Sequence, residues 1–381
     1  MNSSFVQLGS IAEFINGAPF KPEDWGKSGA RIIRIQNLTD PTKPFNRTER
    51  SVDERLRVRP GDLLVSWSAT LGVFEWPGPD EAVLNQHIFR VVPDHKRVEK
   101  SYLRYALERA LFEMQRHLHG ATMQHVNRAE FLGTKLFLPE LAEQRRIAET
   151  LDRAEALRAK RRAALAQLDA LTQAIFFDLF GDPATNPKGW QRVKLGDAVF
   201  SASDGPHVSP TYSDDGIPFI STRHVRAGEI TWGDLKFISP EDAEIHWRKC
   251  KPEFGDILYT KGGTTGLAVA VTTNEPFALW VHVALLKPNP TKVNSTWLES
   301  MLNTEFCYRQ SQELTHGIAN RDLGLTRMIK IDMFLPPLTL QHEFARRVAA
   351  VKKLKTTHQA SLAELDGLFA ALQFRAFRGE L

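Results

Sequence analysis

The chain contains 381 residues, of which 42% are hydrophobic and 25% are charged, and its formal net charge is +4. The length fits two to four domains better than one core, and the small positive charge permits a polyanionic partner without requiring one. Cys250 and Cys307 lie far apart, which excludes a disulfide framework and a CxxC zinc site. Because the N-terminus has no secretory pattern and no run of about eighteen apolar residues occurs, we expect a cytoplasmic protein without a membrane partner.

The first predicted globular unit spans residues 1–138 and mixes strands with helix. Residues 29–35 follow a glycine turn, and residues 63–67 follow a proline-glycine turn, so both are predicted strands. Residues 85–92 alternate well enough to form another strand, and residues 102–117 have helical spacing. The unit is therefore predicted to be mixed α/β.

A long helix is predicted for residues 139–181, because no proline or glycine interrupts it between its ends and its residues favour helix. Apolar side chains recur along it about every three and a half residues, with a break near Arg161. A stripe of this period predicts a partner helix. The residues predicted to make that pairing are Ile147, Leu151, Leu165, Leu168 and Ile175.

The second predicted globular unit, residues 182–335, repeats the landmarks of the first in the same order. Leu195-Gly196 matches Leu8-Gly9, and His316 matches His119. The offset between matched positions rises from 187 residues at the first landmark to 197 at the last, so the early loops vary in length. A constant frame with variable loops is typical of recognition surfaces.

Residues 336–381 repeat the long helix, and the polar break in their stripe, at His358, matches that at Arg161. The two stripes favour an antiparallel coiled coil in which each helix buries the other. Two unrelated amphipathic helices, each packing on its own domain, remain an alternative. The pairing residues predicted on the second helix are Phe344, Val348, Val351, Leu362, Leu365 and Leu368.

Five features, each occurring twice and in order, resemble the DNA specificity subunit of type I restriction-modification systems along essentially the whole chain. They are the Leu-Gly openings, the Gly-Asp-(Leu/Ile)-Leu segments at Gly61 and Gly255, the His-Gly segments, the LPxLxxQ entries at Leu138 and Leu335, and the twin helices. The resemblance implies two target recognition domains, each of which reads one half of a bipartite DNA site. Because the two units differ in sequence, that site should be asymmetric.

The same resemblance also implies the protein partners. The first implied partner is double-stranded DNA. The paired helices would set the distance between the half-sites and would dock two methyltransferase subunits. Endonuclease/translocase subunits would then join through the methyltransferase core.

Polar side chains on the loops after the Gly-Asp segments are the first candidates for DNA contact, and the run at residues 261–266 offers backbone amides and a cation. The run lacks the Walker spacing for a nucleotide. In the resembled family a basic residue often follows this strand, and Trp67 departs from that pattern. A glycine-rich turn without a ligand remains an alternative. The candidates are Ser66, Ser68, Thr70, Thr260, Lys261, Thr264 and Thr265.

The second group of candidates lies in the His-Gly segments, where Gln, Asn and Arg supply the side chains that pair with adenine and guanine edges. A polar loop that caps the following strand is the alternative. The histidines there have no carboxylate or cysteine at ligand spacing, so no metal site is predicted. The candidates are Thr122, Gln124, Asn127, Arg128, Asn320 and Arg321.

Several motifs of catalysis do not occur in the sequence. The chain lacks the (N/D)PP(Y/F) loop of adenine methyltransferases, a glycine-rich cofactor turn, a Walker motif and a nuclease carboxylate cluster. We therefore predict a non-catalytic subunit that binds no cofactor. Two other hypotheses stay open, namely a free-standing tandem DNA-binding regulator or bridging protein, and an enzyme whose active site has no recognised motif.

Overall fold

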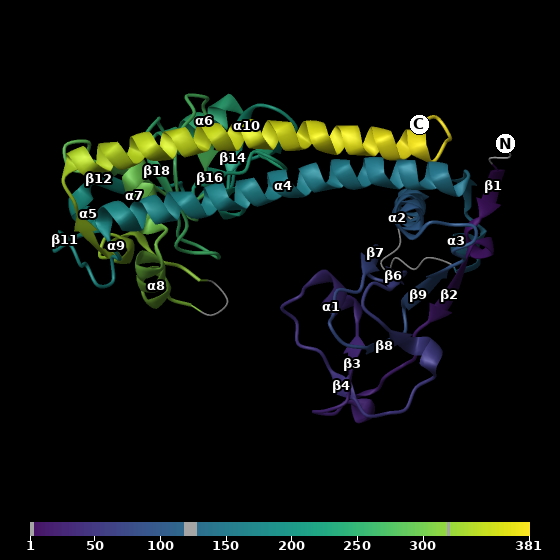
Figure 1. Ribbon diagram of the computed structural model, residues 1–381. Helices are drawn as coiled ribbons and strands as arrows, with labels where there is room; N and C mark the ends of the chain where they lie inside the picture. The colour runs from purple at the N-terminus through teal and green to yellow at the C-terminus, as the bar shows by residue number, and fades with distance from the viewer. Residues whose placement is uncertain (1–3, 118–127, 318–320) are drawn as a thin grey trace. The chain divides into compact units, whose positions relative to one another are not determined.

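The computed structural model describes residues 4–117, 128–317 and 321–381 (Figure 1). The chain divides into two compact units: unit 1 consists of Met1–Arg162 with Ala360–Leu381, and unit 2 of Ala163–Gln359. Each unit thus contains one of the predicted globular regions together with a part of both long helices. The division differs from the boundaries expected from the sequence because each long helix has its two ends in different hydrophobic cores.

Unit 1 contains two four-stranded sheets and a separate strand pair. The first sheet is antiparallel with the order β2-β9-β6-β7, and the second has the order β4-β3-β8-β5 with β3 and β8 parallel. The strands are β1 (Ser4–Gln7), β2 (Ala12–Asn16), β3 (Ala30–Ile33), β4 (Arg47–Thr48), β5 (Arg57–Val58), β6 (Leu63–Ser66), β7 (Gly72–Glu75), β8 (Ala82–Leu84), β9 (Ile88–Pro93) and β10 (Lys135–Leu138), which pairs with β1. The helices are η1 (Leu8–Ser10), η2 (Pro22–Asp24), α1 (Ile35–Thr39), η3 (Glu54–Leu56), α2 (Lys100–His117) and α3 (Arg128–Gly133).

Unit 2 repeats the antiparallel sheet and the terminal strand pair of unit 1, whereas its mixed sheet has its additional strand at the opposite edge and it contains a further two-stranded pair. Its antiparallel sheet has the order β12-β21-β18-β19, its mixed sheet has the order β13-β17-β14-β20, and β11 pairs with β22. The strands are β11 (Gln191–Lys194), β12 (Val199–Asp204), β13 (Tyr212–Ser213), β14 (Ile217–Ile220), β15 (Val225–Arg226), β16 (Glu229–Ile230), β17 (Lys236–Ile238), β18 (Ile257–Thr260), β19 (Ala268–Ala270), β20 (Ala278–Leu279), β21 (Val283–Pro288) and β22 (Asp332–Leu335). The helices are α5 (Leu195–Ala198), η4 (Thr222–His224), α6 (Pro240–Trp247), α7 (Ser295–Leu302), α8 (Glu305–Glu313) and α9 (Leu325–Met328). The repeated strand order confirms the predicted tandem of mixed α/β units.

The structure adjusts two details of the sequence reading. The strand predicted at residues 85–92 begins only at Ile88, because His87 has φ of 72°, outside the extended region. In unit 2 the register shifts between Val199 and Ser201, so one extra residue bulges from β12. This bulge adds one residue to the offset between matched positions of the two repeats.

The buried glutamine of the LPxLxxQ motif lies in the first turn of each long helix and anchors it. In α4 (Leu141–Phe180), Gln144 Nε2 donates to the carbonyls of Pro139 (2.8 Å) and Arg97 (2.9 Å), and Oε1 accepts from the Glu99 N–H (2.8 Å). The bonds to Arg97 and Glu99 tie the helix start to the segment that precedes α2 (Lys100–His117).

The second long helix, α10 (Leu338–Ala376), is anchored in the same way. Gln341 Nε2 donates to the carbonyls of Pro336 (2.9 Å) and Lys292 (3.0 Å), and Oε1 accepts from the Asn294 N–H (2.8 Å). Both glutamines are 0% exposed. The motif is therefore repeated in structure as well as in sequence, and it joins each helix to its own globular region.

The two long helices lie side by side and antiparallel within each unit (Figure 1). In unit 1, Arg158 Nε is 2.6 Å from Asp366 Oδ1, so the start of α4 meets the end of α10. In unit 2, Lys355 Nζ is 2.6 Å from Asp169 Oδ1, which joins the end of α4 to the start of α10.

The residues predicted to pair the helices are buried to different degrees. Five of them are buried, namely Ile147, Leu151, Phe344, Val348 and Val351, and five are half-buried, namely Leu165, Leu168, Ile175, Leu362 and Leu365. Leu368 differs from the expectation, since its side chain is 51% exposed. Its neighbour Phe369 points inward instead, where its ring lies 6.0 Å from that of Tyr105 on α2.

By length and composition alone, α4 is long and apolar enough to cross a membrane. An 18-residue window within it has a mean hydropathy of 1.2, and 11% of that window is buried in the protein. One such helix is weak evidence for a membrane span, because an amphipathic helix with an apolar face for a protein partner passes the same test.

Candidate nucleic-acid interface

The loops after β6 and β18 occupy equivalent positions in the two units. Ser66 is the register partner of Ile88, and Thr260 is the register partner of Val283. The residue that follows each strand donates its backbone N–H to a histidine carbonyl, from Trp67 to His87 O at 3.2 Å and from Lys261 to His282 O at 2.9 Å. Trp67 and Lys261 are therefore structural counterparts.

Lys261, predicted as a DNA contact, is buried in unit 2. Its side chain is 7% exposed, and Nζ lies 3.0 Å from Asp204 Oδ2 and 3.4 Å from Asp322 Oδ1. Nζ also donates to the carbonyl of Val281 at 3.4 Å. An ammonium group with three such partners beneath the surface is not available to a phosphate, so the charge here is a structural element of the loop.

Threonines of the same loop divide between structural and exposed positions. Thr260 is 0% exposed and its Oγ1 accepts from the Leu267 N–H at 2.9 Å. Thr265 is 1% exposed and its hydroxyl lies 3.0 Å from that of Thr315. Thr264 lies exposed at the tip, next to Gly263 with φ of 66°. Of the three predicted threonines, Thr264 alone presents its side chain to solvent.

In unit 1 the loop after β6 shows the same division. Ser66 is fully buried, and its Oγ donates to the carbonyls of Thr70 at 2.6 Å and Ser68 at 3.3 Å. Ser68 is 6% exposed, whereas Thr70 is exposed at the tip. The buried serine holds the turn closed and leaves Thr70 as the predicted contact that faces solvent.

An aromatic cluster supports the loop of unit 1 where unit 2 has its ion pairs. The Trp67 ring stacks on Phe89 with centroids 5.7 Å apart, and its Nε1 donates to Asn16 Oδ1 at 3.3 Å. Arg128 is exposed, donates to the carbonyl of Phe14 at 3.2 Å and lies 5.8 Å from the Phe89 ring centroid. Arg128 therefore joins the same cluster with a cationic group at the surface.

The second predicted segment of unit 2 packs on its loop. Gly263 donates its N–H to the carbonyl of Arg321 at 3.0 Å, and Leu323 donates to the carbonyl of Lys261 at 2.7 Å. Arg321 is exposed, and its Nη2 donates to Gln312 Oε1 at 2.6 Å. The fold thus places the Arg321 backbone beside the loop that carries Thr264. The candidates Thr122, Gln124, Asn127 and Asn320 lie outside the described residues.

Asn16 and Asp204 are among the residues of this arrangement that the sequence does not predict. Asn16 and Asp204 both end a strand that follows the Leu-Gly opening, and the register places each opposite an equivalent residue of its sheet, Phe89 and Ala284. The bulge in β12 shifts their offset to 188 residues, which hides the correspondence in the sequence. A polar residue at the end of a strand next to a loop was the signal that could have revealed them.

The electrostatics of unit 2 centre on Asp204. Burial alone would raise the pKa of this carboxyl, but hydrogen bonds from Lys249 (2.5 Å) and from Lys261 outweigh burial and hold the pKa below its usual value. The carboxylate is therefore charged at neutral pH and holds two ammonium groups. Among the residues that the structure describes, no cluster of histidine, cysteine and carboxylate side chains could bind a metal ion.

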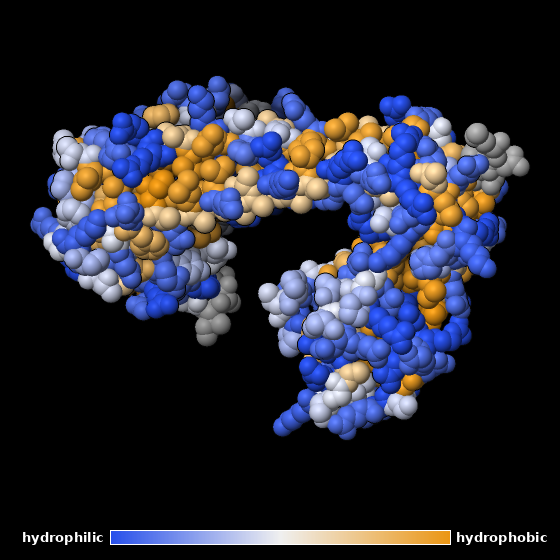
Figure 2. Space-filling view, viewed as in Figure 1, coloured by the Kyte–Doolittle hydropathy of each residue, from blue (hydrophilic) through white to orange (hydrophobic). Residues whose placement is uncertain are grey.

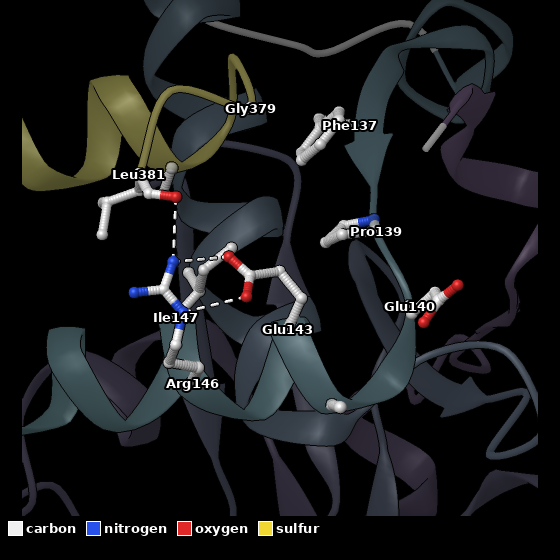
Figure 3. Close-up of a pocket in the computed structure, with 10 residues that line it drawn as sticks. Phe137, Pro139, Glu140, Glu143, Arg146, Ile147, Gly379 and Leu381 are labelled. Atoms are coloured by element: carbon white, nitrogen blue, oxygen red, sulfur yellow. Dashed lines mark hydrogen bonds and ion pairs between the residues drawn. The ribbon is translucent and has the colours of Figure 1, made fainter. Parts of the chain in front are cut away.

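A separate cavity of about 520 Å³ lies in unit 1 between the start of α4 and the end of the chain (Figure 3). Arg146 bridges the Glu143 carboxylate, at 2.6 and 2.9 Å, and the Leu381 carbonyl, at 2.8 Å. Phe137 and Ile147 supply apolar walls. None of the candidate DNA-binding residues that the structure describes lines this cavity.

The fold and these loops define a two-unit α/β protein with a repeated frame and two chemically different loop sites. Residues 2–167 match a family model described as the type I restriction modification DNA specificity domain. The specificity subunit of the type I restriction enzyme EcoBI from Escherichia coli is 24% identical over 411 residues, which cover 99% of this chain and 85% of that protein. The MjaVIII specificity subunit from Methanocaldococcus jannaschii is 21% identical over 79% of this chain and 75% of the relative.

Two solved structures share the fold. The S subunit of a type I restriction-modification system from M. genitalium superimposes with a TM-score of 0.56 at 13% identity, over 99% of this chain and 96% of the other. The second structure is described as the structural basis of complex assembly and conformational transition of the type I R-M system. One of its chains superimposes with a TM-score of 0.58 at 18% identity, over 99% of this chain and 98% of the other. Residues 2–167 of this chain thus match a type I DNA specificity domain, and nearly the whole chain is similar to specificity subunits of type I restriction enzymes.

Proposed function

We propose that this chain gives a type I restriction-modification complex its DNA sequence specificity. Unit 1 reads one half of a bipartite, asymmetric site in double-stranded DNA and unit 2 reads the other. The observation that carries the proposal is the pair of loop sites, which have one frame and different chemistry. An indole and an amide, Trp67 and Asn16, stand in unit 1 where Lys261 and Asp204 stand in unit 2.

The surface residues at these loops are suited to DNA. Thr70 and Thr264 are exposed at the loop tips, and Arg128 and Arg321 are exposed on segments that contact the same two loop sites. Hydroxyl and guanidinium groups are common donors to phosphates and base edges. We assign DNA contact to these four side chains, and a supporting role within the loops to the buried Ser66, Ser68, Thr260 and Thr265.

The long helices carry a second repeated feature, which fits two copies of one protein partner. Large apolar side chains lie exposed on α4, and each has an exposed apolar counterpart on α10 at an offset of 197 residues. Apolar surface is visible along both helices (Figure 2). These residues are Leu157, Leu171 and Phe177 on α4, and Leu354, Leu368 and Phe374 on α10.

Exposed apolar side chains repeated in this way mark a protein interface. We therefore assign the helices to docking two methyltransferase subunits, through which endonuclease/translocase subunits join the complex. The helices also set the gap between the two half-sites. In this proposal the chain itself is non-catalytic, binds no cofactor and works in the cytoplasm, where its DNA target lies.

Co-expression with a type I methyltransferase subunit that assembles with this chain, in a host free of adenine methylation, tests the proposal. Single-molecule sequencing of the host DNA should show methylated adenines in one asymmetric two-part motif with a fixed gap, only when this chain is present. Methylation without the chain, or none despite a stable complex, would contradict the proposal and favour a free-standing DNA-binding protein.

A further inference from the structure

Lys261 belongs to a network of alternating charges inside unit 2. Its ammonium group lies between the carboxylates of Asp204 (3.0 Å) and Asp322 (3.4 Å), and Asp204 also binds Lys249 at 2.5 Å. The side chains of Lys261 and Asp204 are 7% and 8% exposed. Removing two charges from water has a large free-energy cost, so a buried pair is weak evidence for stability and is better explained by what it positions.

The fold itself does not require this ion pair. In unit 1 the neutral pair Trp67 and Asn16 occupies the equivalent positions, and the strand order of the sheet is the same. Both sheets also pair their strands in matching register at these positions. The charges of unit 2 therefore serve something particular to unit 2.

What the network holds is the segment that carries Arg321. Asp322 bonds to Lys261 through its side chain and pairs by backbone with Gly262 in an isolated bridge. On either side of it, the Arg321 carbonyl accepts from the Gly263 N–H and the Leu323 N–H donates to the Lys261 carbonyl. Two backbone hydrogen bonds, which form the bridge, and one ion pair thus hold residues 321–323 against the loop at residues 261–263.

The orientation of the Arg321 side chain is fixed from the other side. Gln312 on α8 accepts a hydrogen bond from Nη2 at 2.6 Å, and the Gln312 amide nitrogen donates to the Thr265 carbonyl at 3.0 Å. An arginine whose backbone and guanidinium group are both held in place loses little freedom on binding. Such an arginine can offer two parallel N–H groups to a guanine edge.

We propose that Lys261 is a positioning residue of the second recognition surface, which holds the Arg321 segment so that the Arg321 guanidinium group reads a guanine in its half-site. The proposal rests on the proposed function. Lys261 itself does not touch DNA. Asp204 fixes the ammonium group from β12, and Asp322 transmits its position to Arg321.

The test uses the complex with the methyltransferase subunits and DNA that carries the methylated motif of the wild-type chain. Affinity is measured for that site and for variants in which each guanine of either half-site is replaced in turn, over a series of salt concentrations. Arg321→Ala should lose discrimination at one guanine by about tenfold or more. Lys261→Met should lose discrimination at the same guanine, and the double variant should lose no more than Arg321→Ala alone, because both changes remove one interaction.

Salt dependence separates positioning from direct contact. A lysine that binds a phosphate contributes about 0.9 to the slope of log affinity against log salt, so Lys261→Met should leave that slope unchanged if the residue only positions Arg321. Lys249→Met is the matched control, since Lys249 binds the same Asp204 carboxylate and makes no contact with the Arg321 segment among the hydrogen bonds and ion pairs of the described residues. It should keep full discrimination.

Two further variants keep the test decisive if Lys261→Met does not fold. Asp322→Asn removes the outer carboxylate, which is 45% exposed, and should lose the same discrimination. Lys261→Arg keeps the charge and should restore part of it. A reduced salt slope, or independent effects of Lys261 and Arg321, would overturn the proposal. Wild-type complex that shows no discrimination at either half-site would instead contradict the proposed function.

Discussion

Unit 1 and unit 2 show one frame used with two kinds of chemistry. In unit 1 the loop after β6 is supported by an indole stacked on Phe89 and hydrogen-bonded to Asn16. In unit 2 the same position holds an ammonium group between carboxylates. The strand order of the antiparallel sheet that carries these loops is the same, so side-chain chemistry at the loops changes without a change in that sheet.

The hydrogen bonds at the N-termini of the two long helices are the same in both units, whereas the loops differ. Gln144 and Gln341 make the same three hydrogen bonds, each to its own unit, with lengths that agree within 0.1 Å. The comparison teaches that this protein keeps the joint between globular region and helix fixed and places its variation at the loops.

The largest effect is expected from a substitution in the aromatic cluster that packs between the long helices and the globular region of unit 2. Phe180 is 0% exposed and packs against Phe176, Phe344 and Trp297, so Phe180→Ala should lower the free energy of unfolding of unit 2 by about 3–5 kcal/mol. Hydrogen exchange of the full chain, followed by mass spectrometry, locates the loss.

Phe177 is the matched control, because it lies on the same helix and is 38% exposed. Phe177→Ala should change stability by less than about 0.5 kcal/mol and should weaken association with the methyltransferase. Equal losses of stability from both variants would contradict the assignment of Phe177 to an interface.

A smaller loss is expected from the glutamine at the helix entry. Gln144→Ala leaves two carbonyls and one N–H without their partner and should destabilise unit 1 by about 2–3 kcal/mol, while exchange in unit 2 stays unchanged. Gln341→Ala should do the same to unit 2 alone. Gln359→Ala, at an exposed position of α10, is the control and should have little effect. Destabilisation of both units by a single variant would contradict the prediction that each glutamine stabilises only its own unit.

The smallest effect depends on pH and should occur in unit 2. His224 and His246 are 3% and 2% exposed, and burial lowers the pKa of both imidazoles. Below about pH 6.5 the unfolded chain takes up protons that the folded unit does not, so the free energy of unfolding falls as the pH drops through that value. Urea midpoints at pH 7.5 and 5.5 should differ less for His224→Gln/His246→Gln than for wild type. An unchanged difference would mean that other groups are responsible.

The sequence predicts the repeated parts of the fold well because periodicity and turn residues act locally. The strand at Leu63–Ser66 and both long helices are examples. Leu368 was placed on the helix seam by its spacing, whereas the aromatic contact with Tyr105 selects Phe369. The choice between Leu368 and Phe369 depends on packing against α2. The spacing of residues within α10 carries no information about that contact.

The loop sites were less predictable because burial is a property of tertiary structure. Lys261 has the residue type and the glycine-rich surroundings of a phosphate contact, yet Asp204 and Asp322 reach it from distant parts of the chain. Thr70 and Thr264 were candidates on the same grounds and do lie exposed. Residue type alone did not separate these cases.

The most direct test of the account is the methylated motif of a chain with longer helices. Four residues inserted after Arg162 and four after Gln359, the boundaries between the units, add about 6 Å to each helix, the length of one to two base pairs. Mapping methylated adenines should show both half-site sequences unchanged and the gap between them longer by one or two base pairs. An unchanged gap, or altered half-site sequences, would contradict two independent reading units joined by a spacer.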